Sequence, residues 1–188
     1  MAGPNKNART RDMVISMAVI VIPVLLIMWI FTTPADEGAE RVDVAATLAV
    51  AQEQSSYPLL VADGLEEDWI PTRVAWALSG QPWITSEPAV GDSWQVGYLS
   101  PDDVYYGVQQ RDESRAEFIS ATTREGSLVG EQVEIAGLTW ERYESDDERT
   151  RSLVSTDGDV TSIVSADTDF VSLEAFAAML VEVAPTAD

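Results

Sequence analysis

The longest apolar run in the chain covers residues 13–31, MVISMAVIVIPVLLIMWIF, and contains no charged side chain. As an α-helix this run would extend about 28 Å, close to the thickness of the hydrocarbon core of a bilayer. Pro23 lies near its middle, where membrane helices tolerate a bend. The pattern therefore predicts a transmembrane helix over residues 13–31.

Charges on the two sides of this run have opposite signs. The flanking residues, basic before the run and acidic after it, are Lys6, Arg9 and Arg11, then Asp36, Glu37 and Glu40. Because positively charged flanks stay in the cytoplasm, we expect residues 1–12 to be a cytoplasmic tail and the C-terminal part to be extracytoplasmic. The chain is then a single-pass protein of the cell membrane with an uncleaved signal anchor. A cleavable signal peptide is the alternative, but TTPADEG offers no clean cleavage site.

Residues 32–41, TTPADEGAER, read as a juxtamembrane linker, and one extracytoplasmic domain is expected over residues 42–188. Three helices are predicted in this domain. Asp43 caps a helix over 44–54, a short helix covers 115–123, and a final helix covers 173–183. The last one has a stripe of apolar residues with helical spacing: Leu173, Phe176, Ala177, Leu180 and Val181.

Runs rich in Val, Trp and Tyr between these helices predict strands that pair as hairpins. The expected strands are 72–77, 94–99 with 104–110, 132–135 with 138–143, and 152–155 with 160–165, the last pair joined through Asp157-Gly158. Strands in adjacent hairpins, framed by helices, predict an α+β fold with one antiparallel sheet and helices packed on one face. An all-β sandwich is the alternative, and it requires the helical stripes to be misread.

Composition restricts the chemistry that this chain can perform. It has 32 acidic and 11 basic residues, a net charge of −21, and no His or Cys. Without these two residue types there are no disulfides, thiolate or imidazole zinc sites, or catalytic triads. The strong negative charge repels polyanions, so nucleic acid is not expected as a partner. We predict no cofactor and no metal.

Tryptophan and acidic residues provide the remaining candidate sites. Trp76, Trp94 and Trp140 lie in predicted strands and are expected in the core. Trp69 and Trp83 lie in proline-containing loops, so each side chain is predicted either to anchor its loop or to contact a partner.

The acidic clusters do not have the spacing of a calcium loop, so we interpret them as solvated turns. Sequence spacing also cannot place two carboxylates at the separation that a hydrolase needs. The clusters are Asp102-Asp103, Asp146-Asp147-Glu148, Asp157 with Asp159, and Asp167 with Asp169.

Several segments together carry a family resemblance. They are RTRDMVISMAVIVIPVLL at 9–26, GLEEDWIPTRVAW at 64–76, WQVGYLSPDD at 94–103, GLTWERYES at 137–145 and RSLVSTDGDVTSIVSADTDFVSLEAFAAML at 151–180. With these segments the chain resembles an actinobacterial family of single-span membrane proteins of unknown function, DUF4245. The resemblance implies membrane topology and a shared fold, and it supplies no active-site residues.

These observations lead to an expectation about function. We expect a non-catalytic, membrane-anchored binding or accessory module that engages an envelope protein, for example as an accessory subunit of a cell-envelope or respiratory membrane complex. Two alternatives stay open. One is a domain that binds a lipid or small ligand in a cavity between sheet and helices. The other is a hydrolase that uses two converging carboxylates, which would make the chain an enzyme.

Overall fold

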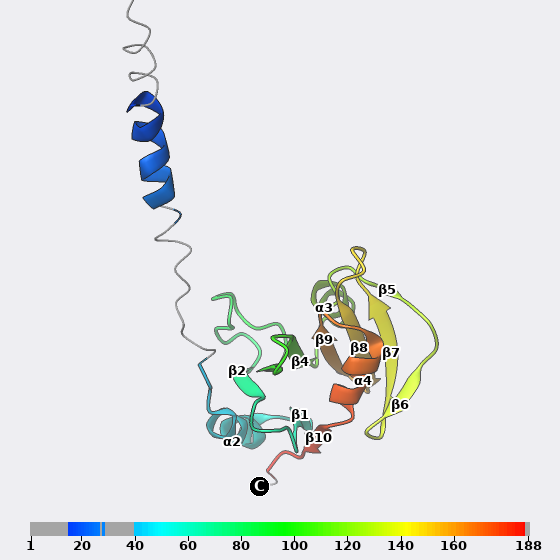
Figure 1. Cartoon of the computed structure of the whole chain (residues 1–188). Helices are drawn as coiled ribbons and strands as arrows, with labels where there is room; N and C mark the ends of the chain where they lie inside the picture. Colours follow the sequence, from blue (N-terminus) through cyan, green and yellow to red (C-terminus); the bar gives the residue numbers. More distant parts are fainter. Residues whose placement is uncertain (1–14, 27, 29–39, 187–188) are drawn as a thin grey trace, which may run out of the picture. The chain divides into compact units, whose positions relative to one another are not determined.

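The computed structural model describes residues 15–26, 28 and 40–186 (Figure 1). Residues 15–26 and 28 are helical, but no helix within the described ranges is both long enough and apolar enough to cross a membrane. Both ends of the predicted span, the tail over 1–12 and linker residues 32–39 lie outside the described residues. The chain divides into two compact units, Met1–Gly38 and Ala39–Asp188. The second unit contains the fold described below.

An antiparallel eight-stranded sheet forms the centre of this unit, in the order β2-β3-β4-β9-β8-β7-β5, with β6 paired to β7. Its strands are β2 (Ile70–Ala77), β3 (Ser93–Leu99), β4 (Tyr105–Arg111), β5 (Ser127–Leu128), β6 (Val133–Ile135), β7 (Leu138–Glu144), β8 (Arg151–Asp157) and β9 (Val160–Ala166). The α+β class and the three predicted hairpins are therefore confirmed.

Three helices accompany the sheet: α2 (Val44–Gln54), α3 (Arg115–Thr122) and α4 (Phe170–Ala177). Helix α2 begins as predicted, because Asp43 Oδ1 accepts hydrogen bonds from the backbone N–H groups of Ala45 and Ala46 at 3.0 and 3.3 Å. Asp169 caps α4 in the same way and accepts a 2.8 Å hydrogen bond from the N–H of Ser172. The helices predicted over 44–54 and 115–123 are confirmed to within one residue.

The predicted final helix over 173–183 is wrong beyond Ala177. Residues Leu180–Val183 form strand β10, which pairs antiparallel with β1 (Leu59–Ala62), a strand that was not predicted from the sequence. A short apolar run fits helical and strand spacing equally well, and here the free edge of β1 decides between them. Consecutive side chains consequently point in opposite directions: Leu180 is 4% exposed and Val181 is 40% exposed.

The turn between β8 and β9 also differs from the expectation. Asp157 pairs with Val160, so Gly158 and Asp159 are the two central turn residues instead of Asp157 and Gly158. Gly158 has φ of 57°, a left-handed conformation that costs glycine little.

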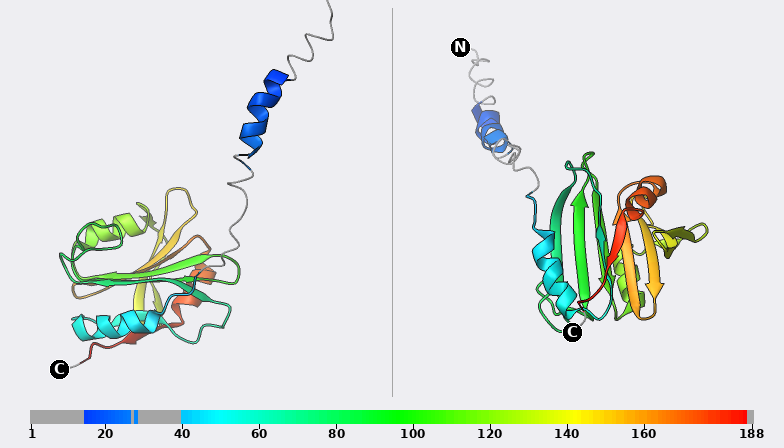
Figure 2. Two further views of the ribbon diagram at one scale, coloured as in Figure 1. Left: turned by 90° about the vertical axis from the view of Figure 1, so that its left-hand side faces the viewer. Right: turned by 90° about the horizontal axis from the view of Figure 1, so that it is seen from below.

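Helices cover both faces of the sheet, so the prediction of helices on one face is wrong. Of two neighbouring cross-strand pairs, Leu153 with Val164 belongs to the main core and Val154 with Ile163 belongs to a second core under Phe118 of α3. Figure 2, left, shows α3 on one side of the sheet and α2 and α4 on the other. We call the side of α2 and α4 the closed face and the side of α3 the open face.

Side chains of the sheet attach β1 to the closed face through hydrogen bonds. The N–H of Leu60 donates to Gln110 Oε1 at 2.7 Å, and Gln110 Nε2 donates to the carbonyl of Pro58 and to Ser162 Oγ, both at 3.1 Å. The indole of Trp94 donates to the carbonyl of Leu60 at 2.9 Å. All hydrogen-bonding atoms of the buried Gln110 amide therefore have partners, which favours one position for β1.

The tryptophans predicted in the core lie on this face. Trp94 and Trp140 are completely buried. Trp76 is half-buried, and its indole donates to Gln54 of α2 at 2.9 Å.

The pairing of β10 with β1 makes a testable prediction. Leu180→Asp should lower the free energy of unfolding by at least about 3 kcal/mol, because it buries an unpaired carboxylate. The neighbouring Val181→Asp should change it by about 0.5 kcal/mol or less, since that side chain points outward. Urea unfolding of both variants measures the difference. Equal, large losses would instead indicate a helix that buries both positions.

Candidate functional site

The two tryptophans proposed as partner contacts lie in different surroundings. The ring of Trp69 stacks on Phe176 of α4, with centroids 5.5 Å apart, and lies 5.2 Å from the ring of Tyr106. Trp69 therefore anchors its loop to the closed face. Trp83 is half-buried in the loop between β2 and β3, where its backbone N–H donates to the carbonyl of Glu87. Contact of either residue with a partner stays a prediction.

A groove of about 540 Å³ runs along the open face between α3 and β4. Its floor contains Tyr105 and Gln109 of β4 and Ser165 of β9, and its wall contains Phe118, Ala121 and Thr122 of α3. Helix α3 is only eight residues long, and Phe118 packs on Val154 of β8 and Ile163 of β9. The groove therefore lies where the cover provided by α3 ends.

The ring of Tyr105 lies flat on the sheet at the floor of the groove. A Cβ atom at Gly97 would lie 2.1 Å from Tyr105 Oη, and one at Gly107 would lie 3.3 Å from the ring. These two glycines face each other across β3 and β4, so the ring occupies the space that their side chains would fill. Tyr105 is nevertheless 40% exposed. The groove thus has a fixed aromatic ring with an accessible surface.

Arg111 occupies the other end of β4 and has an unusual environment in so acidic a protein. Its guanidinium carbon lies 4.6 Å from the centre of the Phe118 ring, and its Nε donates to Ser93 Oγ at 3.3 Å. Within the described part of the chain, neither terminal guanidinium nitrogen has a hydrogen-bond or ion-pair partner. Burial lowers the pKa of Arg111, but an arginine remains a cation at neutral pH.

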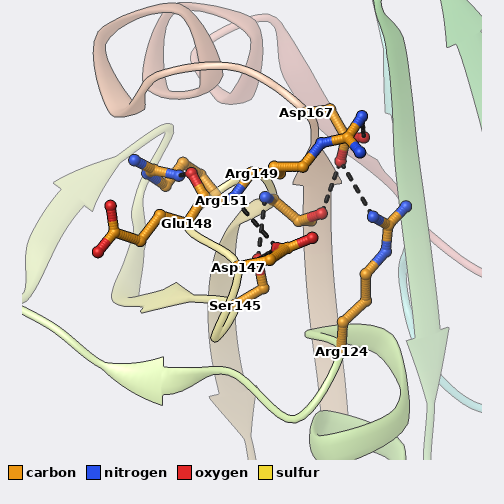
Figure 3. Close-up of polar contacts among 8 residues, drawn as sticks. Arg124, Ser145, Asp147, Glu148, Arg149, Arg151 and Asp167 are labelled. Atoms are coloured by element: carbon orange, nitrogen blue, oxygen red, sulfur yellow. Dashed lines mark hydrogen bonds and ion pairs between the residues drawn. The ribbon is translucent and has the colours of Figure 1, made fainter.

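Asp167 lies at the opposite end of the groove and is surrounded by partners (Figure 3). The hydroxyl of Thr150 donates to Asp167 Oδ1 at 2.6 Å. Arg124 and Arg149 form ion pairs with its two oxygens at 3.5 and 3.9 Å. These pairs are largely exposed, so they contribute little to stability. The Arg124 pair connects the end of α3 to the end of β9, and the Arg149 pair connects the turn between β7 and β8 to the same place.

Arg149 belongs to the turn between β7 and β8, which contains one of the acidic clusters (Figure 3). Ser145 Oγ donates to Asp147 Oδ1 at 2.6 Å and accepts a hydrogen bond from the N–H of Thr150 at 3.0 Å. The hydrogen bond from Ser145 holds the pKa of the fully exposed Asp147 below its usual value. Asp147 therefore shapes a turn, and within the described residues no group of three or more acidic side chains is placed to hold a metal ion.

A smaller hollow of about 240 Å³ lies beside Gln110 and Tyr57. The Gln110 amide there is already hydrogen-bonded, and Tyr57 Oη donates to the carbonyl of Asp92 at 2.9 Å. Burial raises the pKa of Tyr57, so its hydroxyl stays protonated. Because both groups serve the structure, this hollow is the weaker candidate.

A family model described as a protein of unknown function, DUF4245, matches residues 6–180. The chain belongs to the DUF4245 family. No curated protein and no solved structure matched it. The range matched by the DUF4245 model includes every residue of the groove, from Asp103 to Asp167.

In this DUF4245 chain the groove was not predictable from the sequence patterns. The patterns indicated Trp69 and Trp83 as candidate contacts, whereas Tyr105, Arg111 and Phe118 line the groove. The available signal was β4 itself, where the second, fourth and sixth residues (Tyr106, Val108, Gln110) face the core and the intervening ones face the groove side. Only the structure shows that α3 reaches Arg111 through Phe118 and leaves the Tyr105 end of this row exposed.

The contact of Tyr105 with Gly97 can be tested by a double-mutant cycle. Gly97→Ala should lower the free energy of unfolding by about 1 kcal/mol, because the new methyl group displaces the ring of Tyr105. In a Tyr105→Ser background the same substitution should leave the free energy of unfolding unchanged. Urea unfolding of the four proteins measures the coupling. An equal cost in both backgrounds would show that the ring does not lie on Gly97.

Ser152 provides a second test on the open face, because its buried Oγ has no hydrogen-bond partner within the described residues. Ser152→Ala should leave the free energy of unfolding unchanged or raise it by up to about 1 kcal/mol. Ser145→Ala is the matched control, since it removes two hydrogen bonds and should lower the same quantity by about 1 kcal/mol. A loss at Ser152 equal to that at Ser145 would reveal a partner for the Ser152 hydroxyl.

Proposed function

We propose that the chain is a non-catalytic, membrane-anchored extracytoplasmic binding module whose binding site is the groove beside α3. The observation that carries this proposal is the guanidinium of Arg111. It is fixed over Phe118, lines a groove of about 540 Å³, and has no carboxylate partner within the described residues of a protein with 32 acidic residues. A pre-positioned, unpaired cation in a concave site is typical of ligand binding.

The arrangement of carboxylates in the groove favours binding over catalysis. Hydrolysis by carboxylates commonly uses two acids, which either flank the reacting bond or share one proton. Asp167 is engaged by Thr150, Arg124 and Arg149, while Asp103 belongs to the turn between β3 and β4. Neither arrangement resembles a free acid/base pair, which supports a non-enzymatic role.

The groove also favours a polar ligand over a lipid. A site for a lipid needs predominantly apolar walls. Here Arg111, Arg124, Asp103 and Asp167 lie among the lining residues. A long acyl chain would remove water from Arg111 and Asp103 and offer them no polar partner in its place, at a large cost in free energy.

A role as an accessory subunit of an envelope or respiratory membrane complex is the second candidate. It is supported by the loop between β2 and β3, where Trp83 is half-buried and the neighbouring Ile84 and Val90 are 40% and 44% exposed. Exposed apolar side chains on a loop suit a protein contact. The two roles are compatible, because the loop and the groove use different residues.

Membrane anchoring through residues 13–31 is supported by the apolar run and by the charges that flank it. After residue 12, 8 of the 11 basic and 31 of the 32 acidic residues remain, a net charge of −23. A reporter fused after Asp188 should be active only outside the cytoplasm, and the protein should stay in the membrane after a carbonate wash. Activity of the fusion in the cytoplasm would contradict the proposed location.

Site-specific photocross-linking in living cells tests the proposed binding site. A photoreactive residue in place of Gln109, on the floor of the groove, should give an adduct with a ligand or partner. The control position is Val171, which lies on α4 and is 79% exposed. Adducts at both positions, or at Val171 alone, would contradict binding in the groove.

A further inference from the structure

Every second residue of β4 points into or beside the groove, which produces a row of four positions: Tyr105, Gly107, Gln109 and Arg111. The ring of Tyr105 lies over Gly107, so at about 3.4 Å per residue the ring and the Cα atom of Arg111 are about 14 Å apart along the strand. Gly107 contributes no side chain and lies under the ring of Tyr105, so the row presents an aromatic ring, then an amide and then a cation. This order of groups restricts the ligands that fit.

The aromatic end of the row suits the flat face of a sugar ring. A tyrosine presents an apolar face that packs against the C–H groups of a pyranose, and the phenol side chain loses little entropy because it has few rotatable bonds. The ring of Tyr105 is already held on Gly97 and Gly107 while it remains 40% exposed. Binding would therefore require little reorganisation.

The middle of the row supplies hydrogen-bonding groups for hydroxyls. The side chains of Gln109 and Ser165 line the groove, and neither has a hydrogen-bond partner within the described part of the chain. An apolar ligand would cover these groups and leave them unsatisfied. A ligand with several hydroxyl or amide groups would satisfy them.

The guanidinium end of the row calls for an anion. Among the described residues the two terminal nitrogens of Arg111 have no partner, and their planar arrangement pairs well with a carboxylate. The net charge of −21 opposes ligands with many negative charges, such as polyphosphates. A single carboxylate meets far less of this repulsion.

From this row we infer that the groove binds a carboxylate-bearing oligosaccharide about two sugar rings long, with one ring on Tyr105 and the carboxylate on Arg111. The inference rests on the proposed function and names the ligand class of the same groove. A volume of about 540 Å³ is sufficient for a molecule of this size.

Calorimetric titration of the full-length chain in mild detergent tests this inference with three ligands. The acidic ligand is the disaccharide of N-acetylglucosamine and N-acetylmuramic acid. Its methyl ester lacks the charge, and N,N′-diacetylchitobiose is a neutral disaccharide. The acid should bind at least about tenfold more tightly than the ester, because charged hydrogen bonds are about twice as strong as neutral ones.

Three variants assign the two halves of the site. Arg111→Gln should give the acid and its ester the same affinity, whereas Arg111→Lys should keep part of the preference. Tyr105→Ser should weaken the binding of both ligands. Arg73→Gln is the matched control, since Arg73 is an exposed arginine of β2 outside the groove. This substitution should leave the affinity for each ligand unchanged. The urea midpoint of each variant reports whether it is folded.

Equal affinities of the wild-type protein for the acid and the ester would overturn the inference. A preference for the acid that persists in Arg111→Gln would also overturn it. An absence of binding by all three ligands would also overturn it. If adducts at position 109 persist in cells in that case, the groove remains the binding site and only the ligand class is wrong. If the adducts at position 109 are absent as well, the proposed function is also contradicted.

Discussion

Alternate residues of every strand point to opposite faces of the sheet, and the two faces of this sheet are covered very differently. The closed face receives α2, α4 and the β1–β10 pair, and Gln110 and Trp94 attach β1 to it through hydrogen bonds to Leu60. The open face receives the eight residues of α3, whose Phe118 covers Val154 and Ile163. The remaining architecture follows from this unequal cover, because a strand with one buried and one open face must alternate between apolar and polar side chains.

The groove is a consequence of the same imbalance. Where α3 ends its cover, β4 carries Tyr105, Gln109 and Arg111 instead of apolar residues. The structure supports these side chains individually: two glycines lie beneath the ring of Tyr105, and Phe118 with Ser93 holds the guanidinium of Arg111. The proposed binding site therefore lies on the sheet, a rigid element, and leaves the core on the other side intact. The negative charge of the rest of the surface then selects against ligands with many anionic groups.

Sequence patterns predicted the local elements better than their arrangement. The cap at Asp43, the hairpins and the buried Trp94 and Trp140 depend on neighbouring residues and were predictable. The β1–β10 pair joins residues more than a hundred positions apart, so no local signal distinguished Leu180–Val183 from the end of a helix. The groove needed the same distant information, because the polar row of β4 indicates an uncovered strand face only when the position of α3 is known. Trp69 shows the converse, since a loop residue that suggested exposure packs on Phe176.

Hydrogen–deuterium exchange tests the central claim, which is that this protein meets its ligand at the open face. Exchange would be compared for the protein in native membranes and after purification in detergent. Binding in the groove predicts slower exchange in native membranes for α3 and for residues 100–104, which adjoin the groove, with no change in α4. Slower exchange confined to the loop over residues 78–92, which contains Trp83, would contradict the account and place the contact outside the groove.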